Sequence, residues 1–296
     1  MNRQPSLMRL LRRLDRSIAS LFFLDQWVIL TAKGLGPASL RWSALHPIIP
    51  PADRYWADPF PILRENRYYV FAEEKLHSTQ RGRIICLVLD TEGRLLSGQV
   101  VLERPYHLSY PFIFDYRGET YMLPESASNR TLEVYRCRHF PDQWELEKVL
   151  MSEVYAVDAT LLELNDRWWM FANVKQEDGT SLDALHLFHA ASPLSSAWTP
   201  HPRNPVVKDL KTARPAGRIF AIGDELIRPS QNNYYRYGYG LNFMRVTTLN
   251  ESAYAESAGA VFEPPPWSKY RAAHTFNQAG GLTVVDAVLR RWKFGA

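Results

Sequence analysis

Short apolar runs alternate with turn residues along most of the chain, and the clearest example spans residues 107–126. An apolar run leads to a turn at Tyr116-Arg117-Gly118, and a second apolar run ends at the carboxylate of Glu125. Two such runs around a glycine-containing turn are typical of a β-hairpin. The same pattern recurs at residues 55–73 and 156–173, and more weakly at residues 214–231 and 274–286.

The five copies recur at nearly even intervals, as their alignment on Asp58, Tyr110, Asp158, Arg214 and His274 shows. Each interval accommodates about four strands of roughly 5–6 residues with their loops, and four-stranded sheets repeated around an axis form a propeller. The pattern therefore predicts an all-β fold, a five-bladed β-propeller, over residues 25–296. A meander or sandwich whose copies are similar by accident is the alternative.

The N-terminal segment follows a helical rather than a strand pattern. Leu7, Leu10, Leu14 and other apolar residues fall on one face of a helix, and most of the arginines fall on the other. This predicts a basic amphipathic helix over residues 1–24. It would pack on the propeller or a partner subunit, or lie on an anionic membrane surface. Residues 25–32 then predict a strand that completes the last blade and closes the ring, which removes a free sheet edge.

Polar side chains occupy matching positions at the ends of the predicted inner hairpins. In the first three copies two such residues are 15 positions apart, namely Asp58 and Glu73, Tyr110 and Glu125, and Asp158 and Asn173. An antiparallel hairpin places the start of its first strand beside the end of its second. We therefore expect these side chains at one rim of the central channel. Arg214, Arg228, Gln231, His107 and His274 should join them there.

Carboxylates that converge on a polar funnel, bordered by aromatic and arginine side chains, are typical of a sugar site. Paired carboxylates supply an acid and a base or nucleophile at a glycosidic bond. We expect Asp58 to be the base or nucleophile, Glu125 the acid, and Asp158 the group that holds the sugar or the developing positive charge. The residues expected to bind substrate are Trp56, Glu73, His107, Tyr110, Asn173, Arg214, Arg228, Gln231 and His274.

A purely structural interpretation of these residues stays open. An aspartate before proline, as at Asp58, often caps a turn. Arg214 and Arg228 each precede a proline and could bind a carboxylate or phosphate ligand bidentately. They could equally pair with the carboxylates of the funnel.

Other kinds of chemistry find little support in the sequence. His186 and His189 lie three apart in a predicted strand and so point to opposite faces, and we expect no metal site. The chain has no glycine-rich phosphate loop and no nucleophile elbow, and we expect no cofactor. Cys86 and Cys137 are too few for a disulfide framework. The net charge of +4 comes with scattered arginines and does not indicate nucleic-acid binding.

The composition indicates a folded domain outside the bilayer. A hydrophobic content of 46% is ample for a packed core, and 296 residues suit one propeller. No apolar run is long enough to cross a bilayer as a helix, so we expect no transmembrane helix. The N-terminus lacks an apolar segment followed by a small-residue cleavage site. We expect a cytoplasmic protein, peripheral to the inner face of the membrane if the basic helix lies on lipid.

Several stretches of the sequence resemble one known family. They are residues 55–60, 107–126, 140–146, 168–171, 192–205, 213–218 and 228–231. Together they resemble the N-terminal domain of plant glucosamine inositolphosphorylceramide transferases. Ala57-Asp58-Pro59 and residues 192–205 are more distantly similar to five-bladed glycosidases of the arabinanase/xylosidase and invertase/levansucrase type.

The resemblance to the glycosidases implies roles for an aspartate in blade one, an aspartate in blade three and a glutamate in blade four. Asp58 and Asp158 match the first two, as base or nucleophile and as transition-state support. Blade four offers residues 228–231 instead of the acid, which would have to be Glu125 or Glu73. The resemblance implies a sugar-related propeller. We expect it to be an enzyme of glycosyl transfer or hydrolysis in surface polysaccharide or glycolipid assembly. The alternative is a non-catalytic sugar-binding or scaffolding propeller that partners a separate glycosyltransferase.

Overall fold

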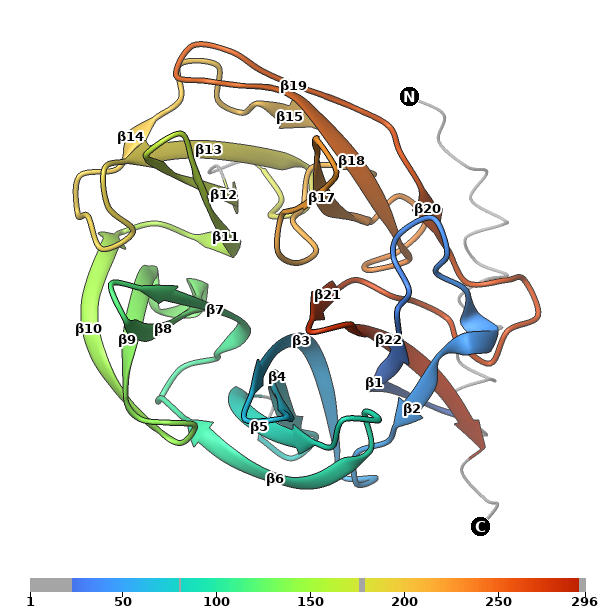
Figure 1. The fold of residues 1–296 in the computed structure, drawn as a ribbon. Coiled ribbons are helices and arrows are strands. Elements are labelled where there is room, and N and C mark those ends of the chain that lie inside the picture. Colours follow the sequence, from blue (N-terminus) through green and yellow to red (C-terminus); the bar gives the residue numbers. More distant parts are fainter. Residues whose placement is uncertain (1–22, 80, 176–178, 293–296) are drawn as a thin grey trace.

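The computed structural model describes residues 23–79, 81–175 and 179–292, which form five antiparallel sheets in a ring about a central axis (Figure 1). The predicted five-bladed propeller is confirmed. Within these ranges the helical segments are two short 3-10 turns, η1 (Trp42–Ala44) and η2 (Ala127–Asn129), and none of them could span a bilayer.

The expected amphipathic helix over residues 1–24 finds no counterpart in the described part of the chain. Residues 1–22 lie outside the described residues. Phe23 and Leu24, which the helix would include, begin strand β1 (Phe23–Lys33) instead. They pair with Trp292 and Arg291 near the other end of the chain, so the boundary between the two expected segments lies earlier than residue 25.

The strands of the first four blades follow the chain in order. Blade one contains β3 (Arg54–Arg64), β4 (Arg67–Leu76), β5 (Gly82–Leu89) and β6 (Leu95–Leu102). Blade two contains β7 (Ser109–Tyr116), β8 (Glu119–Ser126), β9 (Thr131–His139) and β10 (Gln143–Ser152). Blade three contains β11 (Ala156–Leu164), β12 (Arg167–Val174), β13 (Ala184–Ala190), β14 (Thr199–Pro200) and β15 (Val207–Lys208). Blade four contains β16 (Phe220–Ile222), β17 (Glu225–Asn232), β18 (Gly240–Leu249), β19 (Tyr254–Ser257) and β20 (Val261–Phe262).

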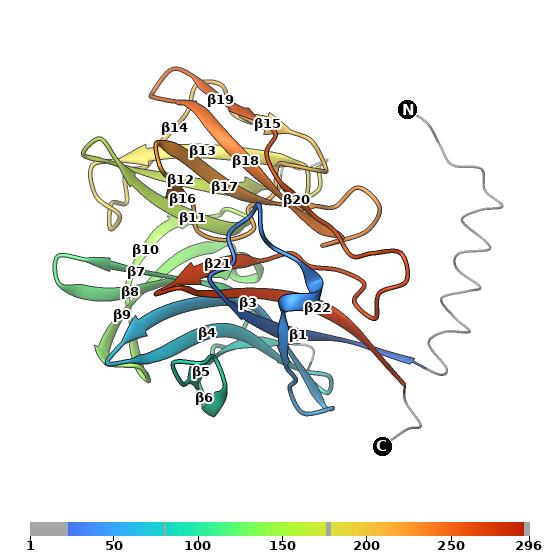
Figure 2. The same cartoon turned by 45° about the vertical axis from the view of Figure 1, so that its right-hand side comes forward.

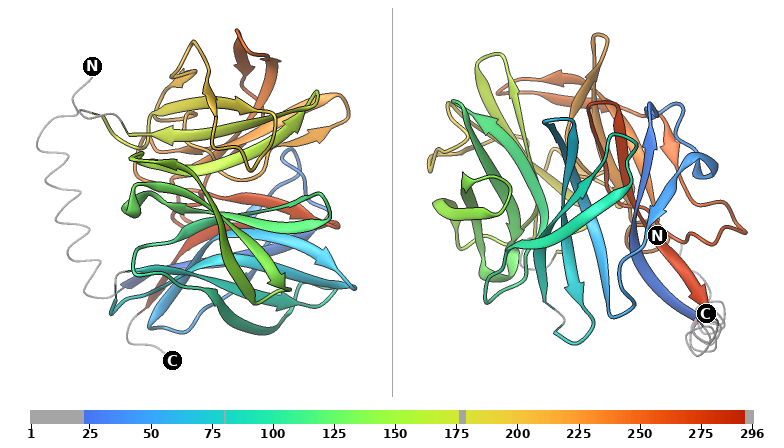
Figure 3. Two further views of the ribbon diagram at one scale, coloured as in Figure 1. Left: turned by 90° about the vertical axis from the view of Figure 1, so that its left-hand side faces the viewer. Right: turned by 60° about the horizontal axis from the view of Figure 1, so that its bottom comes forward.

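Blade five joins the two ends of the chain. It contains β21 (Phe276–Ala279), β22 (Leu282–Trp292), β1 and β2 (His46–Ile48). Strand β1 pairs with β22 from the Phe23–Trp292 pair to the Lys33–Leu282 pair. Figures 2 and 3 show the blue β1 beside the red β22 from further directions. The N-terminal strand therefore closes the ring, as the sequence predicts.

Blade four departs most from the expected pattern. Residues 214–219 do not form the regular inner strand of a hairpin, because Pro215 has no N–H to donate and Gly217 has a φ of 133°. Only the short β16 continues them. The segment 250–267, which follows β18, contains β19 and β20, which supply the outer edge of the blade.

Aromatic side chains pack the blades against one another. The Phe71 ring of blade one lies edge-on to Trp144 of blade two, with ring centroids 5.5 Å apart, and Phe60 meets Tyr110 at 4.8 Å. All four side chains are buried. Aromatic pairs contribute roughly 0.5–1.5 kcal/mol beyond the area they bury. The Phe60–Tyr110 contact joins the inner strands β3 and β7 of neighbouring blades.

The three clearest copies share one backbone feature at that position. Asp58, Tyr110 and Asp158 have φ values of 53°, 43° and 53°, and each lies in a register shift between the two strands of its inner hairpin. Residues other than glycine rarely adopt this left-handed conformation, and bulges often redirect a side chain beside a functional site. The sequence repeat therefore corresponds to a repeated bulge at the axis.

Candidate active site

Asp58 lies at the centre of the ring and is held by residues of two other blades. Its Oδ2 accepts a hydrogen bond from the Tyr110 N–H at 3.2 Å, and its Oδ1 accepts one from the Thr275 hydroxyl at 2.9 Å. The Asp58 side chain is almost fully buried. The carboxylate is therefore fixed in one orientation.

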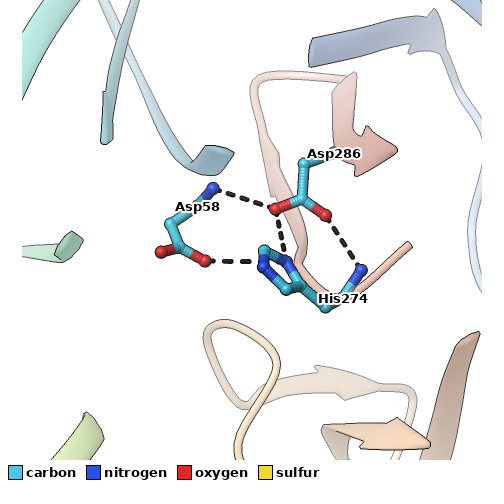
Figure 4. Close-up of side chains that lie close together, drawn as sticks. All are labelled: Asp58, His274 and Asp286. Carbon is cyan, nitrogen blue, oxygen red and sulfur yellow. Dashed lines mark hydrogen bonds and ion pairs between the residues drawn. The ribbon is translucent and has the colours of Figure 1, made fainter. Parts of the chain in front are cut away.

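His274 lies between Asp58 and a second buried aspartate, Asp286 of β22 (Figure 4). Its Nδ1 donates to Asp286 Oδ2 at 2.6 Å and lies 3.7 Å from Asp58 Oδ1. The indole of Trp27 stacks on the imidazole, with ring centroids 4.0 Å apart. Asp286 Oδ2 also accepts the Asp58 N–H at 2.9 Å, so the three side chains form one hydrogen-bonded cluster.

The pKa values of Asp58 and His274 are both raised, for different reasons. Burial raises the pKa of Asp58 to about 6, although the nearby His274 imidazolium opposes the shift. Burial alone would lower the pKa of His274, but the carboxylates of Asp286 and Asp58 together raise it to about 9. At neutral pH the imidazole is therefore charged and the Asp58 carboxyl is mostly ionised.

Asp58, His274 and Asp286 are also the described residues whose spacing would suit a metal ion, with ligand atoms within 4.8 Å of one another. The hydrogen-bond donors around Asp286 fit a hydrogen-bonded cluster better than a metal site. Its Oδ1 accepts the backbone N–H groups of His274 and Thr275, both at 2.9 Å, and its Oδ2 accepts the two bonds described above. Each oxygen has two acceptor sites, so this carboxylate has little capacity left for a cation.

A second cluster joins blades two, three and four beside the first. Arg214 Nε donates to Asp158 Oδ2, and Arg214 Nη2 lies 3.8 Å from Glu125 Oε2. Gln231 Nε2 donates to the same Asp158 oxygen at 2.9 Å. Arg214 therefore pairs with funnel carboxylates, which was one of its two expected roles.

Glu125 is the proton-holding member of this second cluster. Burial and the charge of Asp158 raise its pKa well above the usual value, against the effect of Arg214. Its Oε2 has no hydrogen-bond partner among the described residues, and neither has Asn173 Oδ1 or Gln231 Oε1. Buried polar atoms are almost always hydrogen-bonded. Three buried oxygens without a hydrogen-bond partner are suited to the hydroxyl groups of a ligand.

Glu73 is a further buried carboxyl at the rim. The Tyr55 hydroxyl donates to Glu73 Oε1 at 3.3 Å, and His107 Nε2 lies 3.4 Å from the same oxygen. Burial, followed by the charge of Asp58, raises the pKa of Glu73 to about 8. Burial also lowers the pKa of His107 to about 4, so this pair is neutral at pH 7.

Two expected binding residues lie elsewhere. Trp56 and Tyr55 are neighbours on one strand and so point to opposite faces, and Trp56 is buried with its Nε1 donating to Glu74 at 3.0 Å. Arg228 makes a bidentate ion pair with Glu256 and does not reach the funnel carboxylates. Its side chain is separated from that of Gln231 by the same alternation along β17.

Tyr110 lies at the axis but serves as a tie between blades. Its hydroxyl hydrogen-bonds the Thr160 hydroxyl at 2.8 Å and accepts the Gly217 N–H at 2.7 Å. The ring is fully buried, so it presents no face to a ligand. The other expected residues, including Glu73, His107, Asn173, Arg214, Gln231 and His274, belong to the clusters described above.

Asp286 and Tyr237 belong to the site but were not singled out from the sequence. A signal for Asp286 was present, because it ends the second strand of the weakest hairpin copy, the one that starts at His274. Tyr237 lies between β17 and β18 with its ring 5.1 Å from the Arg214 guanidinium. Together Tyr237 and Arg214 line a cavity of about 460 Å³ with Tyr155 and Lys175.

Comparison with known proteins identifies the family. Residues 49–275 match the family model described as glucosamine inositolphosphorylceramide transferase 1, N-terminal. The chain belongs to this family. It is 32% identical over 230 residues to glucosamine inositolphosphorylceramide transferase 1 of Oryza sativa subsp. japonica, which covers 74% of this chain and 31% of that protein. The Arabidopsis thaliana protein of the same name is 30% identical over 227 residues, covering 73% and 29%.

The resemblance seen in the sequence is therefore confirmed, and the chain spans less than a third of the length of these relatives. Solved structures with a similar fold include a family 117 glycoside hydrolase from Zobellia galactanivorans, with a TM-score of 0.57, 11% identity and coverage of 89% and 90%. The catalytic domain of the Coprinopsis cinerea GH62 alpha-L-arabinofuranosidase gives a TM-score of 0.60 at 11% identity, covering 88% and 97%. At this identity the likeness concerns the fold.

Proposed function

We propose that this propeller acts on a glycan or glycosyl donor at the rim of its central channel, by glycosyl transfer or hydrolysis. One observation carries the proposal: two buried carboxyl groups, Asp58 and Glu125, stand beside Asp158 in unlike electrostatic surroundings. Environments that separate the pKa values of neighbouring carboxyls assign an acid and a base. The fold shared with glycoside hydrolases and the name of the plant relatives support the same chemistry.

Each carboxyl has a role that its surroundings favour. The raised pKa of Glu125 favours its protonated form, which would donate its proton to the leaving oxygen as the glycosidic C–O bond breaks. Asp58 is mostly ionised at that pH and would accept the proton of the attacking hydroxyl, or attack the sugar itself. Asp158, held by Arg214 and Gln231, would face the positive charge that develops on the sugar.

A second function, sugar binding without catalysis, is favoured by a different observation. Both oxygens of Asp58 already accept hydrogen bonds from Tyr110 and Thr275, and Asp158 is tied to Arg214. Carboxylates satisfied in this way can shape a binding site without reacting. Such a module would partner a separate glycosyltransferase.

Turnover of nucleotide sugars and aryl glycosides separates the two functions. Wild type is compared with Asp58→Asn, Glu125→Gln and a control, Glu119→Gln, whose carboxylate is partly exposed at the far end of β8 beside Arg136. Turnover that is lost in the first two variants and kept in the control supports catalysis. No turnover by the wild type, with sugar binding that survives both substitutions, would leave the binding module.

The setting of this activity is also a proposal. We infer a role in surface polysaccharide or glycolipid assembly at the cytoplasmic face of a membrane, because the plant relatives are named glucosamine inositolphosphorylceramide transferase and the sequence has a basic N-terminal segment. The arginines of residues 1–24 would bind anionic lipid. Sedimentation with anionic and neutral vesicles tests this, since replacing Arg9, Arg12 and Arg13 with Gln should abolish binding to the anionic ones.

A further inference from the structure

The segment between β17 and β18, residues 233–239, is unusually rich in exposed tyrosine. Tyr234, Tyr235 and Tyr237 are 56%, 59% and 45% exposed, and Tyr239 follows them. Exposed aromatic side chains that gather in one place mark interaction sites more often than isolated ones do. Nothing in the proposed acid–base chemistry accounts for Tyr234 and Tyr235.

Hydrogen bonds hold this tyrosine loop in one shape. The Asn233 side chain accepts the Gly238 N–H at 2.7 Å, and the Tyr239 N–H donates to the Asn232 carbonyl at 2.9 Å. The Gly238 carbonyl accepts the Ala273 N–H at 3.0 Å. A surface that is ordered before binding loses less conformational entropy when a ligand arrives.

A cationic side chain lies over the ring of each of two tyrosines. Lys211 Nζ is 4.8 Å from the centroid of the Tyr234 ring, and the Arg214 guanidinium is 5.1 Å from that of Tyr237. Lys211 and Arg214 are three positions apart on one segment, and the two tyrosines are three apart on the other. The segments lie side by side, because the Asn233 N–H donates to the Leu210 carbonyl at 2.8 Å. The two pairs are therefore neighbouring steps of one row.

A third cation–tyrosine pair lines the same cavity as Arg214 and Tyr237. Lys175 Nζ is 5.6 Å from the ring of Tyr155, which is 37% exposed. Both residues line the cavity of about 460 Å³ with Arg214 and Tyr237. Arg214 also contacts the candidate carboxylates. The row thus runs from Tyr155, across the cavity beside the site, to Tyr234 on the outer surface.

We propose that these three cation–tyrosine pairs bind successive units of a carbohydrate chain, so that the substrate is an oligosaccharide or polysaccharide rather than a single sugar. This inference rests on the proposed function of the site. Tyrosine rings stack on the apolar faces of sugar rings, and ammonium and guanidinium groups donate hydrogen bonds to hydroxyls. The same surface suits a protein less well, because lysine is depleted in the cores of protein interfaces and two of the pairs contain one.

Affinity as a function of chain length tests the proposal on the full chain. A glycan array with each repeat at several lengths identifies the best repeat, and titration calorimetry then uses its chains of one to six units. For the wild type we expect affinity to rise at least tenfold between one unit and three or more units. Tyr234→Ala and Lys211→Gln should lower the affinity for the longer chains about tenfold, and affect the single unit far less.

Arg117→Gln is the matched control, because its guanidinium lies 5.1 Å from the Tyr116 ring at the turn of the β7–β8 hairpin, away from the rim. It should bind every length as the wild type does. Sugar binding that does not depend on length, or that Tyr234→Ala leaves unchanged, would overturn the row and leave the function of the site standing. The absence of binding to any carbohydrate would overturn both.

Discussion

Asp286→Asn probes the buried charge cluster directly, because it removes one negative charge and preserves the size of the side chain. In the wild type, Asp286 Oδ2 accepts from His274 Nδ1 at 2.6 Å and from the Asp58 N–H at 2.9 Å. An amide nitrogen at that position would face two donors. Of all groups, Asp286 does most to offset the lowering of the His274 pKa by burial. Without its charge, burial would lower the pKa of His274 towards or below its usual 6.5.

The size of the effect follows from the two pKa values of His274. A pKa of about 9 in the folded protein, against 6.5 in the unfolded chain, corresponds to about 3 kcal/mol of stability. Because the folded-state pKa is the higher one, this contribution is complete below pH 6.5 and is lost as the pH rises through 9. We expect Asp286→Asn to lower the free energy of unfolding by about 3 kcal/mol at pH 6, which is roughly 5–10 °C in Tm.

Urea and thermal unfolding, followed by circular dichroism from pH 6 to pH 10, provide the test. The difference between wild type and variant should shrink by about 3 kcal/mol over that range. Asp25→Asn is the control, since this partly exposed carboxylate pairs with Arg290 in the same blade and should contribute less than about 1 kcal/mol. A variant within about 0.5 kcal/mol of wild type at pH 6 would refute the reasoning, as would a difference that is constant with pH.

Three further variants test other features of the fold and the site. The pKa of Glu73 is raised to about 8 in the folded protein, so its stabilising contribution is present below pH 4.5 and is lost as the pH rises through 8. Glu73→Gln should therefore be a few kcal/mol more stable than wild type at pH 9 and about equal to it at pH 4. Urea unfolding at the two pH values measures this difference. Gly217→Ala should prevent folding, because the added Cβ would lie 2.0 Å from the Phe276 carbonyl oxygen. Gly118→Ala, at an open turn, is the control and should lower the free energy of unfolding by only about 1 kcal/mol. Soluble yield and circular dichroism distinguish the two variants. Arg214→Gln leaves a buried carboxylate unpaired and should destabilise by about 3–5 kcal/mol in urea, and a loss below about 1 kcal/mol would contradict the ion pair.

The propeller could be predicted from the sequence because the same local backbone geometry recurs at matching positions of the repeat. Asp58, Tyr110 and Asp158 were aligned on sequence alone, and all three occupy a left-handed bulge of an inner hairpin. Spacing, turn residues and the polar strand end recur together in these copies. Blade four was harder, because Pro215 and Gly217 interrupt its inner strand and the period of two is lost.

The side chains of the site were harder to predict than the positions of its strands. Neighbouring residues of a strand point to opposite faces of the sheet, so a prediction that is wrong by one residue places a side chain on the wrong face. Trp56 was expected at the funnel, but it is the neighbouring Tyr55 that contacts Glu73 there. The sequence placed Arg228 near the strand end but gave no sign of Glu256, which lies far along the chain and pairs with it. Asp286 was visible only as the end of a weak copy. Long-range pairing of charges, and not local pattern, decides the cases of Arg228 and Asp286.

The same pairing explains how the site can hold an acid although blade four supplies no glutamate at the matching position. Among the described residues, the three aspartates at the axis face two cations, His274 and Arg214, so the local charge is already negative. Any further buried carboxyl there is driven to keep its proton, by burial and by its neighbours. Glu125 and Glu73 are the two that do so. An acid at this rim is therefore specified by the charge balance at the axis, and a neighbouring blade can provide it.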